Sequence, residues 1–316
     1  MKDTNAANVL TTKARRRKWL YSLNKYKWIL LMVLPAMIVI FIFVYIPIGG
    51  NVLAFKDYSI RRGIWGSDWV GMEHFIRLWN RPAFWRVFQN QIEISLMNLA
   101  LGFPTPIILA LLLNEMRHIK LKRVFQTAYT FPHFISWIVV AGIIVGFLAD
   151  QGIVNQVILF FGGDRNQILH DGGQFRILLY VSQLWKTVGW SSILYLAALA
   201  SINPELYEAA AIDGAGRWKQ MIYITLPSIL PLASLLLVLS AGSILSGGFD
   251  QIINLYNPMV MERSDIIATY IFRTAIVGGM NLSYATAVGV FQAVVNLIIL
   301  IVVNITVRFM GQEGVL

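Results

Sequence analysis

Residues 202–231 read INPELYEAAAIDGAGRWKQMIYITLPSILP. Asn203 can cap a helix that begins at Pro204, because proline lacks the backbone N–H that a first turn leaves unpaired. The carboxylate of Glu205 then lies near the positive end of the helix dipole, and a run of alanines continues the helix. Gly214 follows and permits a positive φ. The stretch therefore predicts a short helix that ends in a turn.

The sequence on both sides of this helix is strongly apolar. Of the 316 residues, 57% are hydrophobic and only 13% are charged, whereas soluble domains carry roughly 25% charged residues. So few charges cannot cover a soluble globule of this size, and the apolar content also excludes a disordered chain. We therefore expect a polytopic membrane protein.

Six stretches have the length and composition of membrane spans. A span needs about 20 mostly apolar residues, and its backbone must pair locally, which favours helices over strands. The predicted fold is all-α, with six transmembrane helices. Their expected bounds are 28–48, 94–114, 127–149, 177–200, 226–248 and 284–307, and Lys186 is the only charged residue inside them.

The distribution of Lys and Arg predicts the sidedness. The segments 1–27, 115–123, 205–219 and 308–316 together hold 15 Lys and Arg against 6 Asp and Glu, while the segments between the other span ends hold 10 of each. Basic residues are retained in the cytoplasm, so both termini and the 203–222 loop are expected there.

The first 27 residues contain the block Lys13-Ala-Arg-Arg-Arg-Lys18. A secretory signal is disfavoured, because the apolar run that follows is too long and has no small-residue cleavage site. Nucleic-acid binding is the other alternative, and a basic cytoplasmic arm at the membrane surface is favoured. The remaining residues, 28–316, are then one transmembrane domain.

Several kinds of chemistry are excluded by residue type. The chain has no cysteine and only four histidines, so disulfides, iron–sulfur clusters and thiolate zinc sites are ruled out. We find no metal-ligand spacing, no catalytic triad pattern and no phosphate-binding loop, so the chain itself is not an ATPase.

Lys186 is the polar residue that most needs an explanation. At helical spacing it shares a face with Gln183 and Trp190, which could line a translocation path, since sugars need an aromatic face and hydrogen-bonding groups. The alternative is that Lys186 snorkels or pairs with a carbonyl or an acid. For Asn98, Gln292 and Asn296 we favour interhelical hydrogen bonding.

The alanine-rich helix at 204–212 has two interpretations that the composition leaves open. It is either an ordinary interfacial helix or a docking element, whose small side chains let a partner approach and whose carboxylates set the register. A resemblance favours the second. Glu208-Ala209-Ala210, Gly214 and Ile224-x-Leu226-Pro227 resemble the signature loop of binding-protein-dependent ABC importer permeases.

The resemblance extends over most of the chain. The longer string Glu208-Ala-Ala-Ala-Ile-Asp-Gly-Ala215 is similar to the sugar-importing branch. Other matching stretches point to the first permease subunit of the polysaccharide and complex-oligosaccharide group. They are Phe55-Lys-Asp-Tyr58, Leu111-Leu-Leu-Asn-Glu115, Phe131-Pro-His-Phe-Ile-Ser-Trp137, Leu184-Trp-Lys-Thr-Val-Gly-Trp190 and Ala285-Thr-Ala-Val-Gly289.

The resemblance implies a type I permease fold and a division of labour. The 203–222 loop would be the coupling helix that docks on a cytoplasmic ATPase. Glu208 would pair with a basic residue, Ala209 and Ala210 would pack in a groove, and Gly214 would make the turn, with Glu205 and Asp213 beside them. ATP and magnesium would belong to the ATPase, so this chain would bind no cofactor.

The implied partners are a second, different permease subunit, a pair of ATPase subunits and an extracytoplasmic solute-binding protein, in a bacterial cytoplasmic (inner) membrane with lipid around the spans. No nucleic acid is implied. In related sugar permeases, substrate contacts lie on the spans before and after the coupling loop. Together with Gln183, Lys186 and Trp190, this places Ser243, Ser246 and Asp250 in a candidate path for an oligosaccharide.

Three alternatives stay open. Another small solute, such as glycerol phosphate, could be the substrate. A secondary transporter or channel would instead show intramembrane acids or inverted repeats, and a membrane enzyme would need paired carboxylates or histidines at a span end. Neither pattern is evident in the sequence.

Overall fold

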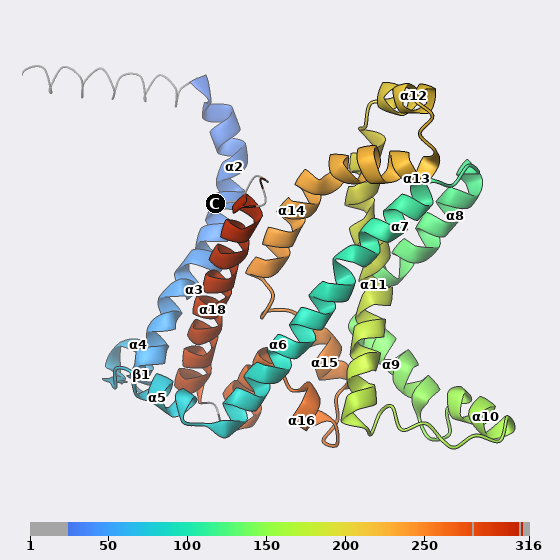
Figure 1. Cartoon of the computed structure of the whole chain (residues 1–316). Helices are drawn as coiled ribbons and strands as arrows, with labels where there is room; N and C mark the ends of the chain where they lie inside the picture. Colours follow the sequence, from blue (N-terminus) through green and yellow to red (C-terminus); the bar gives the residue numbers. More distant parts are fainter. Residues whose placement is uncertain (1–24, 280, 310, 312–316) are drawn as a thin grey trace, which may run out of the picture.

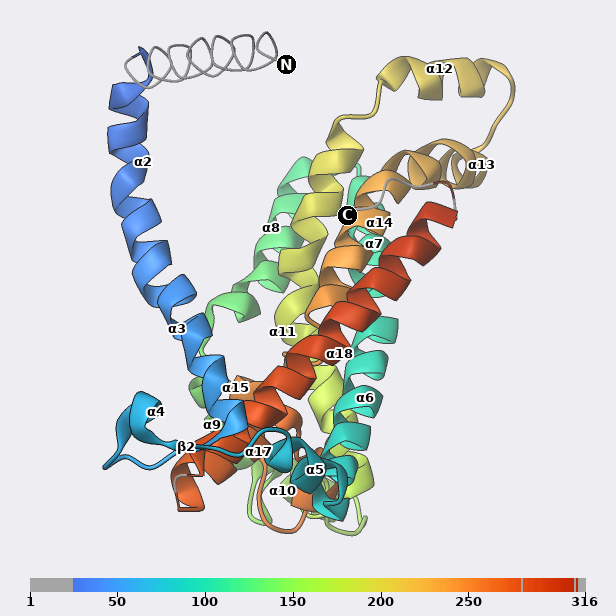
Figure 2. The same cartoon turned by 90° about the vertical axis from the view of Figure 1, so that its left-hand side faces the viewer.

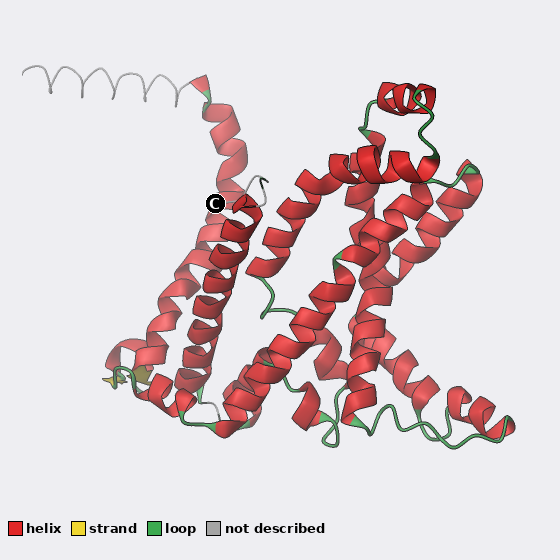
Figure 3. Ribbon diagram, in the orientation of Figure 1, coloured by secondary structure: helices red, strands yellow, loops and turns green. Residues whose placement is uncertain are grey.

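The computed structural model describes residues 25–279, 281–309 and 311, and most of them are helical (Figure 3). The basic block at 13–18 lies outside the described residues. A two-stranded antiparallel ladder pairs β1 (Lys56–Asp57) with β2 (Asp68–Trp69).

The helices are short at the two ends of the molecule and long between them. The first half contains α2 (Lys27–Ile40), α3 (Ile46–Ile48), α4 (Gly63–Gly66), α5 (Glu73–Trp79), α6 (Pro82–Gly102), α7 (Pro104–Asn114), α8 (Ile119–Thr130), α9 (Trp137–Leu148) and α10 (Ile153–Phe160). The second half contains α11 (Gly172–Ala200), α12 (Pro204–Ile212), α13 (Arg217–Gln220), α14 (Leu226–Gly242), α15 (Phe249–Leu255), α16 (Met261–Ser264), α17 (Ile267–Phe272) and α18 (Leu282–Phe309). Single 3₁₀ or π turns connect several of them, at Phe41–Tyr45, Gly49–Phe55, Phe131–Phe134, Met221–Thr225 and Arg273–Val277.

Five helical stretches of the described chain are long and apolar enough to cross a membrane. They are Lys27–Phe55, Pro82–Asn114, Trp137–Phe160, Arg217–Gly242 and Leu282–Phe309. The predicted span 177–200 lies within α11, whose 29 residues extend about 44 Å. This helix carries Arg176 and Lys186 and is less apolar than the other five.

Some helices differ from the predicted bounds. The span expected at 226–248 ends at Gly242, because residues 243–246 form a turn. The span expected at 94–114 begins at Pro82, because the charges that seemed to end it, Arg86 and Glu93, are paired with residues from later in the chain. The span expected at 127–149 is broken by the 3₁₀ turn Phe131–Phe134, where Pro132 cannot continue the hydrogen-bond ladder of α8.

The ends of the helices form two layers (Figures 1 and 2). The start of α2, the turn between α7 and α8, the pair α12 and α13, and the end of α18 lie toward one end, and α4, α5, α10 and α16 lie at the other. Figure 2 shows α2 standing apart from the bundle, and none of its side chains is buried. The turn Gly49–Phe55 that follows packs against α18.

Three clusters of buried apolar side chains hold the bundle together. One joins α6, α11, α15 and α17 around Phe175 and Ile266, and a second joins α5, α6, α17 and α18 around Phe84 and Tyr284. The third, around Tyr195, joins α7, α11 and α14. Many large apolar side chains outside these clusters are exposed, as expected where lipid replaces water.

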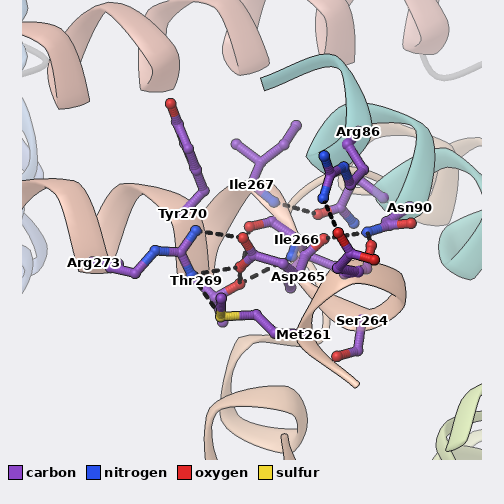
Figure 4. A network of polar contacts seen from close by, with 12 residues as sticks. Arg86, Asn90, Met261, Ser264, Asp265, Ile266, Ile267, Thr269, Tyr270 and Arg273 are labelled. Carbon is purple, nitrogen blue, oxygen red and sulfur yellow. Dashed lines mark hydrogen bonds and ion pairs between the residues drawn. The ribbon is translucent and has the colours of Figure 1, made fainter. Parts of the chain in front are cut away.

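A polar cluster fixes the end of the molecule opposite α12 (Figure 4). Asp265 is 5% exposed, and its carboxylate accepts hydrogen bonds from Arg273 Nη2 at 2.5 Å and Thr269 Oγ1 at 2.7 Å. Its backbone carbonyl accepts from Asn90 Nδ2 of α6 at 3.1 Å. Hydrogen bonding to Asp265 raises the pKa of the Arg273 guanidinium, so Arg273 stays positively charged. The cluster thereby ties α16 and α17 to α6.

We expect Asp265→Asn to destabilise the fold, because it leaves the guanidinium of Arg273 without its counter-charge. Arg273 is about one-third exposed, so the loss should be about 2 kcal/mol rather than the full value for a buried pair. This corresponds to about 5 °C in the apparent melting temperature of the detergent-solubilised protein. The control is Asp68→Asn in the exposed pair with Arg62, which should change that temperature by about 1 °C or less. Equal shifts for both variants would contradict this assignment.

Candidate functional site

The 203–222 loop forms a helix and a turn, as the sequence predicts. Asn203 caps α12, with Oδ1 accepting from the backbone N–H of Glu205 at 3.1 Å. The helix ends at Gly214, whose φ is +78°, and the N–H of Ala215 donates to the carbonyl of Ala210 at 2.8 Å. These contacts give α12 defined ends.

The surface of α12 is open to a partner. No residue of α12 is buried, and Glu205, Glu208, Ala209, Asp213 and Gly214 are all exposed, while Ala210 is half-buried. One hydrogen bond, between Tyr207 Oη and Thr225 Oγ1 at 2.9 Å, connects α12 to the start of the next long helix.

Sequence reasoning missed two apolar side chains of this loop. Ile212 is 88% exposed and Trp218 is 75% exposed, at opposite ends of the Gly214 turn. The sequence could have indicated them, because both are large apolar residues in an otherwise polar loop. Exposed large apolar side chains beside a helix of small residues are typical of a protein interface.

A cavity of about 420 Å³ lies between α6, α7, α11 and α14. Its polar wall consists of Ser95, Asn98, Gln183, Trp190, Ser191, Tyr195 and Ser240. No Asp, Glu, Lys or Arg is among the residues that line it. The cavity therefore offers amide and hydroxyl groups and an indole face, which suits a polyhydroxylated solute.

The structure brings together two of the six residues predicted for the path. Gln183 and Trp190 line the cavity, whereas the ammonium of Lys186 donates hydrogen bonds to backbone carbonyls of the segment between α8 and α9. Ser246 accepts a hydrogen bond from Asn296 Nδ2 at 2.9 Å. Two others, Ser243 and Asp250, are outside the cavity lining. The role of all six in transport stays a prediction.

Gln292 and Asn296 of α18 bind another segment of the chain, as expected, but their partner Leu245 lies in the turn after α14 and not in a helix. Gln292 Nε2 donates to the carbonyl of Leu245 at 2.6 Å, and Asn296 Oδ1 accepts from the N–H of Leu245 at 3.1 Å. Asn98, for which the same role was expected, lines the cavity.

Ser191 and Tyr195 could have been found from the sequence, since they continue the helical face of Gln183. Asn98 and Ser240 could not be assigned to the same cavity, because their helices are placed beside α11 only by tertiary packing.

The family is identified by comparison with known proteins. Residues 102–312 match the family described as the binding-protein-dependent transport system inner membrane component. The chain belongs to this family. It is a multi-pass component of the inner membrane, and its relatives are ABC transport permeases, which are non-catalytic membrane subunits.

One curated relative is similar over almost the whole length. The polygalacturonan/rhamnogalacturonan transport system permease protein YteP of Bacillus subtilis (strain 168) is 42% identical over 308 residues, which cover 97% of this chain and 96% of the relative.

Two solved structures share the fold. A crystal structure of a bacterial ABC transporter involved in the import of the acidic polysaccharide alginate contains a chain that is 39% identical, with a TM-score of 0.86, and the match covers 93% of this chain and 100% of that one. A second crystal structure shows the bacterial alginate ABC transporter in complex with an alginate pentasaccharide-bound periplasmic protein. Its matching chain is 40% identical with a TM-score of 0.85, covering 93% of this chain and 99% of that one. This permease has the type I ABC permease fold.

We expect Trp190→Ala to weaken solute uptake, because it removes the aromatic face of the cavity. Loss of one stacking contact of about 1.4 kcal/mol corresponds to a tenfold higher KM for uptake into whole cells. The matched control is Trp185→Ala on the same helix, since Trp185 lines an apolar groove with Val140 and Val181 instead of the cavity. An unchanged KM in Trp190→Ala, or an equal change in both variants, would remove Trp190 from the path.

Proposed function

We propose that this permease forms one half of the translocation path of an ATP-driven importer for acidic oligosaccharides, and that the 203–222 loop couples it to a separate ATPase. The observation that carries the proposal is the continuity between the cavity and the loop. Gln183 and Trp190 line the cavity from α11, and α12 begins only four residues after α11 ends. A movement of α12 is therefore transmitted to the cavity wall.

The ATPase partner is inferred from the surface of α12. Glu208 is exposed and can pair with a basic residue, and the small side chains of Ala209 and Ala210 allow close approach. Exposed Ile212 and Trp218 supply apolar contacts at the margin of the same surface. The sequence has no phosphate-binding loop of its own, so the energy must come from another polypeptide.

A second permease subunit is inferred from surfaces that this chain leaves uncovered. The long apolar segment Lys27–Phe55 is a candidate span, yet its apolar window is unburied within the chain. A different sister subunit would supply the other half of the path. In this assembly α11 is the fourth span in chain order, between the spans that contain α9 and α14. Both termini would lie in the cytoplasm with α12, in accord with the excess of Lys and Arg in the sequence segments 1–27, 115–123, 205–219 and 308–316.

The substrate class is inferred from relatives together with the cavity. Polygalacturonan and alginate, named for the similar proteins, are both polymers of uronic acids. Asn98 and Gln183 can donate amide N–H groups to carboxylates and hydroxyls, and Trp190 can stack on a sugar ring. A neutral cavity avoids trapping an anion, which favours passage over tight binding. An extracytoplasmic binding protein would deliver the substrate.

The proposal is tested by purifying the chain from its native membrane and identifying what accompanies it. We expect an ATPase, a second permease and a solute-binding protein, and ATP hydrolysis by this complex should be stimulated by oligogalacturonides or alginate oligosaccharides presented with the binding protein. Neutral oligosaccharides of equal length serve as the control. Transport by the chain alone in liposomes, without nucleotide, would overturn the proposal.

We expect Glu208→Lys and Gly214→Asp each to lower uptake at least tenfold while membrane insertion is unchanged. The first reverses the charge that sets the docking register, and the second places a side chain where φ is +78°. Uptake and substrate-stimulated ATP hydrolysis are measured in parallel, with Asp164→Lys, an exposed carboxylate far from the loop, as the control. Normal uptake by both loop variants would remove the assigned role.

A further inference from the structure

The break between α8 and α9 creates a local problem inside the membrane. The chain leaves α8 at Thr130, makes the 3₁₀ turn Phe131–Phe134 and is extended at Ile135 before Ser136 caps α9. Within the break the carbonyl of Pro132 accepts from the N–H of Ile135 at 3.2 Å. Other carbonyl groups in such a break lose their partners in the helix, and in hydrocarbon no water replaces them. A donor from another helix has to satisfy them.

Lys186 of α11 supplies these donors. Its Nζ donates to the carbonyl of His133 at 3.0 Å, to that of Pro132 at 3.2 Å and also to that of Ile135. An ammonium group has three N–H donors, so the three acceptors match its capacity. Nζ also lies 5.6 Å from the centre of the Trp137 ring, and the residue is only 7% exposed.

The next turn of α11 contacts the same break. A Cβ atom added at Gly189 would lie 2.0 Å from the carbonyl oxygen of Tyr129 and 2.7 Å from the backbone nitrogen of Thr130, so the two backbones approach too closely for any side chain. The Trp190 ring stacks on His133, with ring centres 4.5 Å apart and planes at 3°, and it meets Phe134 edge-on at 5.8 Å.

We propose that Lys186 is a positioning residue that binds the helix break at 130–135 to α11 and thereby fixes the orientation of Trp190 in the cavity wall. The transport part of this proposal rests on the proposed function. The break is held by the ammonium of Lys186, by backbone contact at Gly189 and by ring stacking at Trp190. The end of α8 and the start of α9 then move together with α11, which continues into α12.

The geometry argues against Lys186 as a substrate ligand. Its three donors are all used by carbonyls, and it is absent from the lining of the cavity that contains Gln183 and Trp190. Among the described residues it has no carboxylate partner within ion-pair distance. The ammonium group of Lys186 therefore binds backbone carbonyls of its own chain and has no donor left for a substrate.

The first test measures the contact directly and does not depend on the solute. The chain has no cysteine, so a single Thr130→Cys reports on the break, where the Thr130 hydroxyl oxygen is buried. In native membranes we expect this thiol to resist a maleimide in the parental chain and to react at least tenfold faster in Lys186→Met. Lys186→Arg, which keeps several donors, should restore most of the protection.

Ser264→Cys is the control for unfolding, because Ser264 is 0% exposed and lies in α16. It should stay protected in every Lys186 variant. If Lys186→Met makes both cysteines reactive, the maleimide reaction of Thr130→Cys and Ser264→Cys is measured again in Lys186→Gln. Equal reactivity of the two cysteines in that variant overturns the proposal. Continued protection of Thr130→Cys in Lys186→Met overturns it as well.

The second test separates positioning from substrate binding by the kinetics of uptake. We expect Lys186→Met to lower the maximal uptake rate about tenfold for acidic and neutral oligosaccharides alike, with Lys186→Arg close to the parental rate. A selective rise in KM for the acidic substrate alone would show that Lys186 binds it and would overturn the proposal. If the parental complex transports no oligosaccharide, the proposed function fails, whereas thiol protection still decides the role of Lys186.

Discussion

The structure depends on one constraint, namely that a backbone group in hydrocarbon must find its partner within the protein. The breaks in its long helices show how the constraint is met. The segment after α14 is held by Gln292 and Asn296, which bind both polar groups of Leu245, and by Ser95, whose hydroxyl donates to the carbonyl of Ile244 at 2.6 Å. At the break before α9, Lys186 donates to the backbone carbonyl of His133 in the same way. Side chains of neighbouring helices thus replace the bonds that each break loses.

The same constraint explains where charges occur. Arg86 and Glu93 extend α6 beyond the predicted span because Glu262 and Arg176 pair with them. Asn90, between them, donates to the backbone carbonyls of Glu262 and Asp265. These pairs lie at the end of the molecule opposite α12, while the cavity lining between the helices carries no charge. Charge is therefore used to fix the ends of the bundle, and neutral amides and hydroxyls are left to face the path.

The sequence predicted what local chemistry determines. Long runs without charged residues predicted the long helices. Asn203 and Gly214 predicted where α12 begins and ends, because capping and a positive φ depend on the type of a single residue. The start of α6 was missed, since the partners of Arg86 and Glu93 come from distant segments. Helical spacing brought Gln183 and Trp190 together, but Asn98 and Ser240 join them only through packing. For Lys186 the sequence left two roles open, and only the position of the 3₁₀ turn at 131–134 decides its contacts.

The helix α11 connects these observations, because it contributes to the cavity, to the break before α9 and to the start of the docking loop. In the proposed coupling, an ATPase docked on the 203–222 loop would change the shape of the cavity through α11, and a stiff connection would limit the movement lost to bending. Gly189 removes the space in which α8 and α11 could slide, and Lys186 supplies bonds that are costly to break in hydrocarbon. The end of α12 at Gly214 is instead exposed and joined to the bundle by few contacts. The chain thus combines an exposed loop with a closely packed contact between α11 and the break at 130–135, which is the arrangement that the proposed coupling would use.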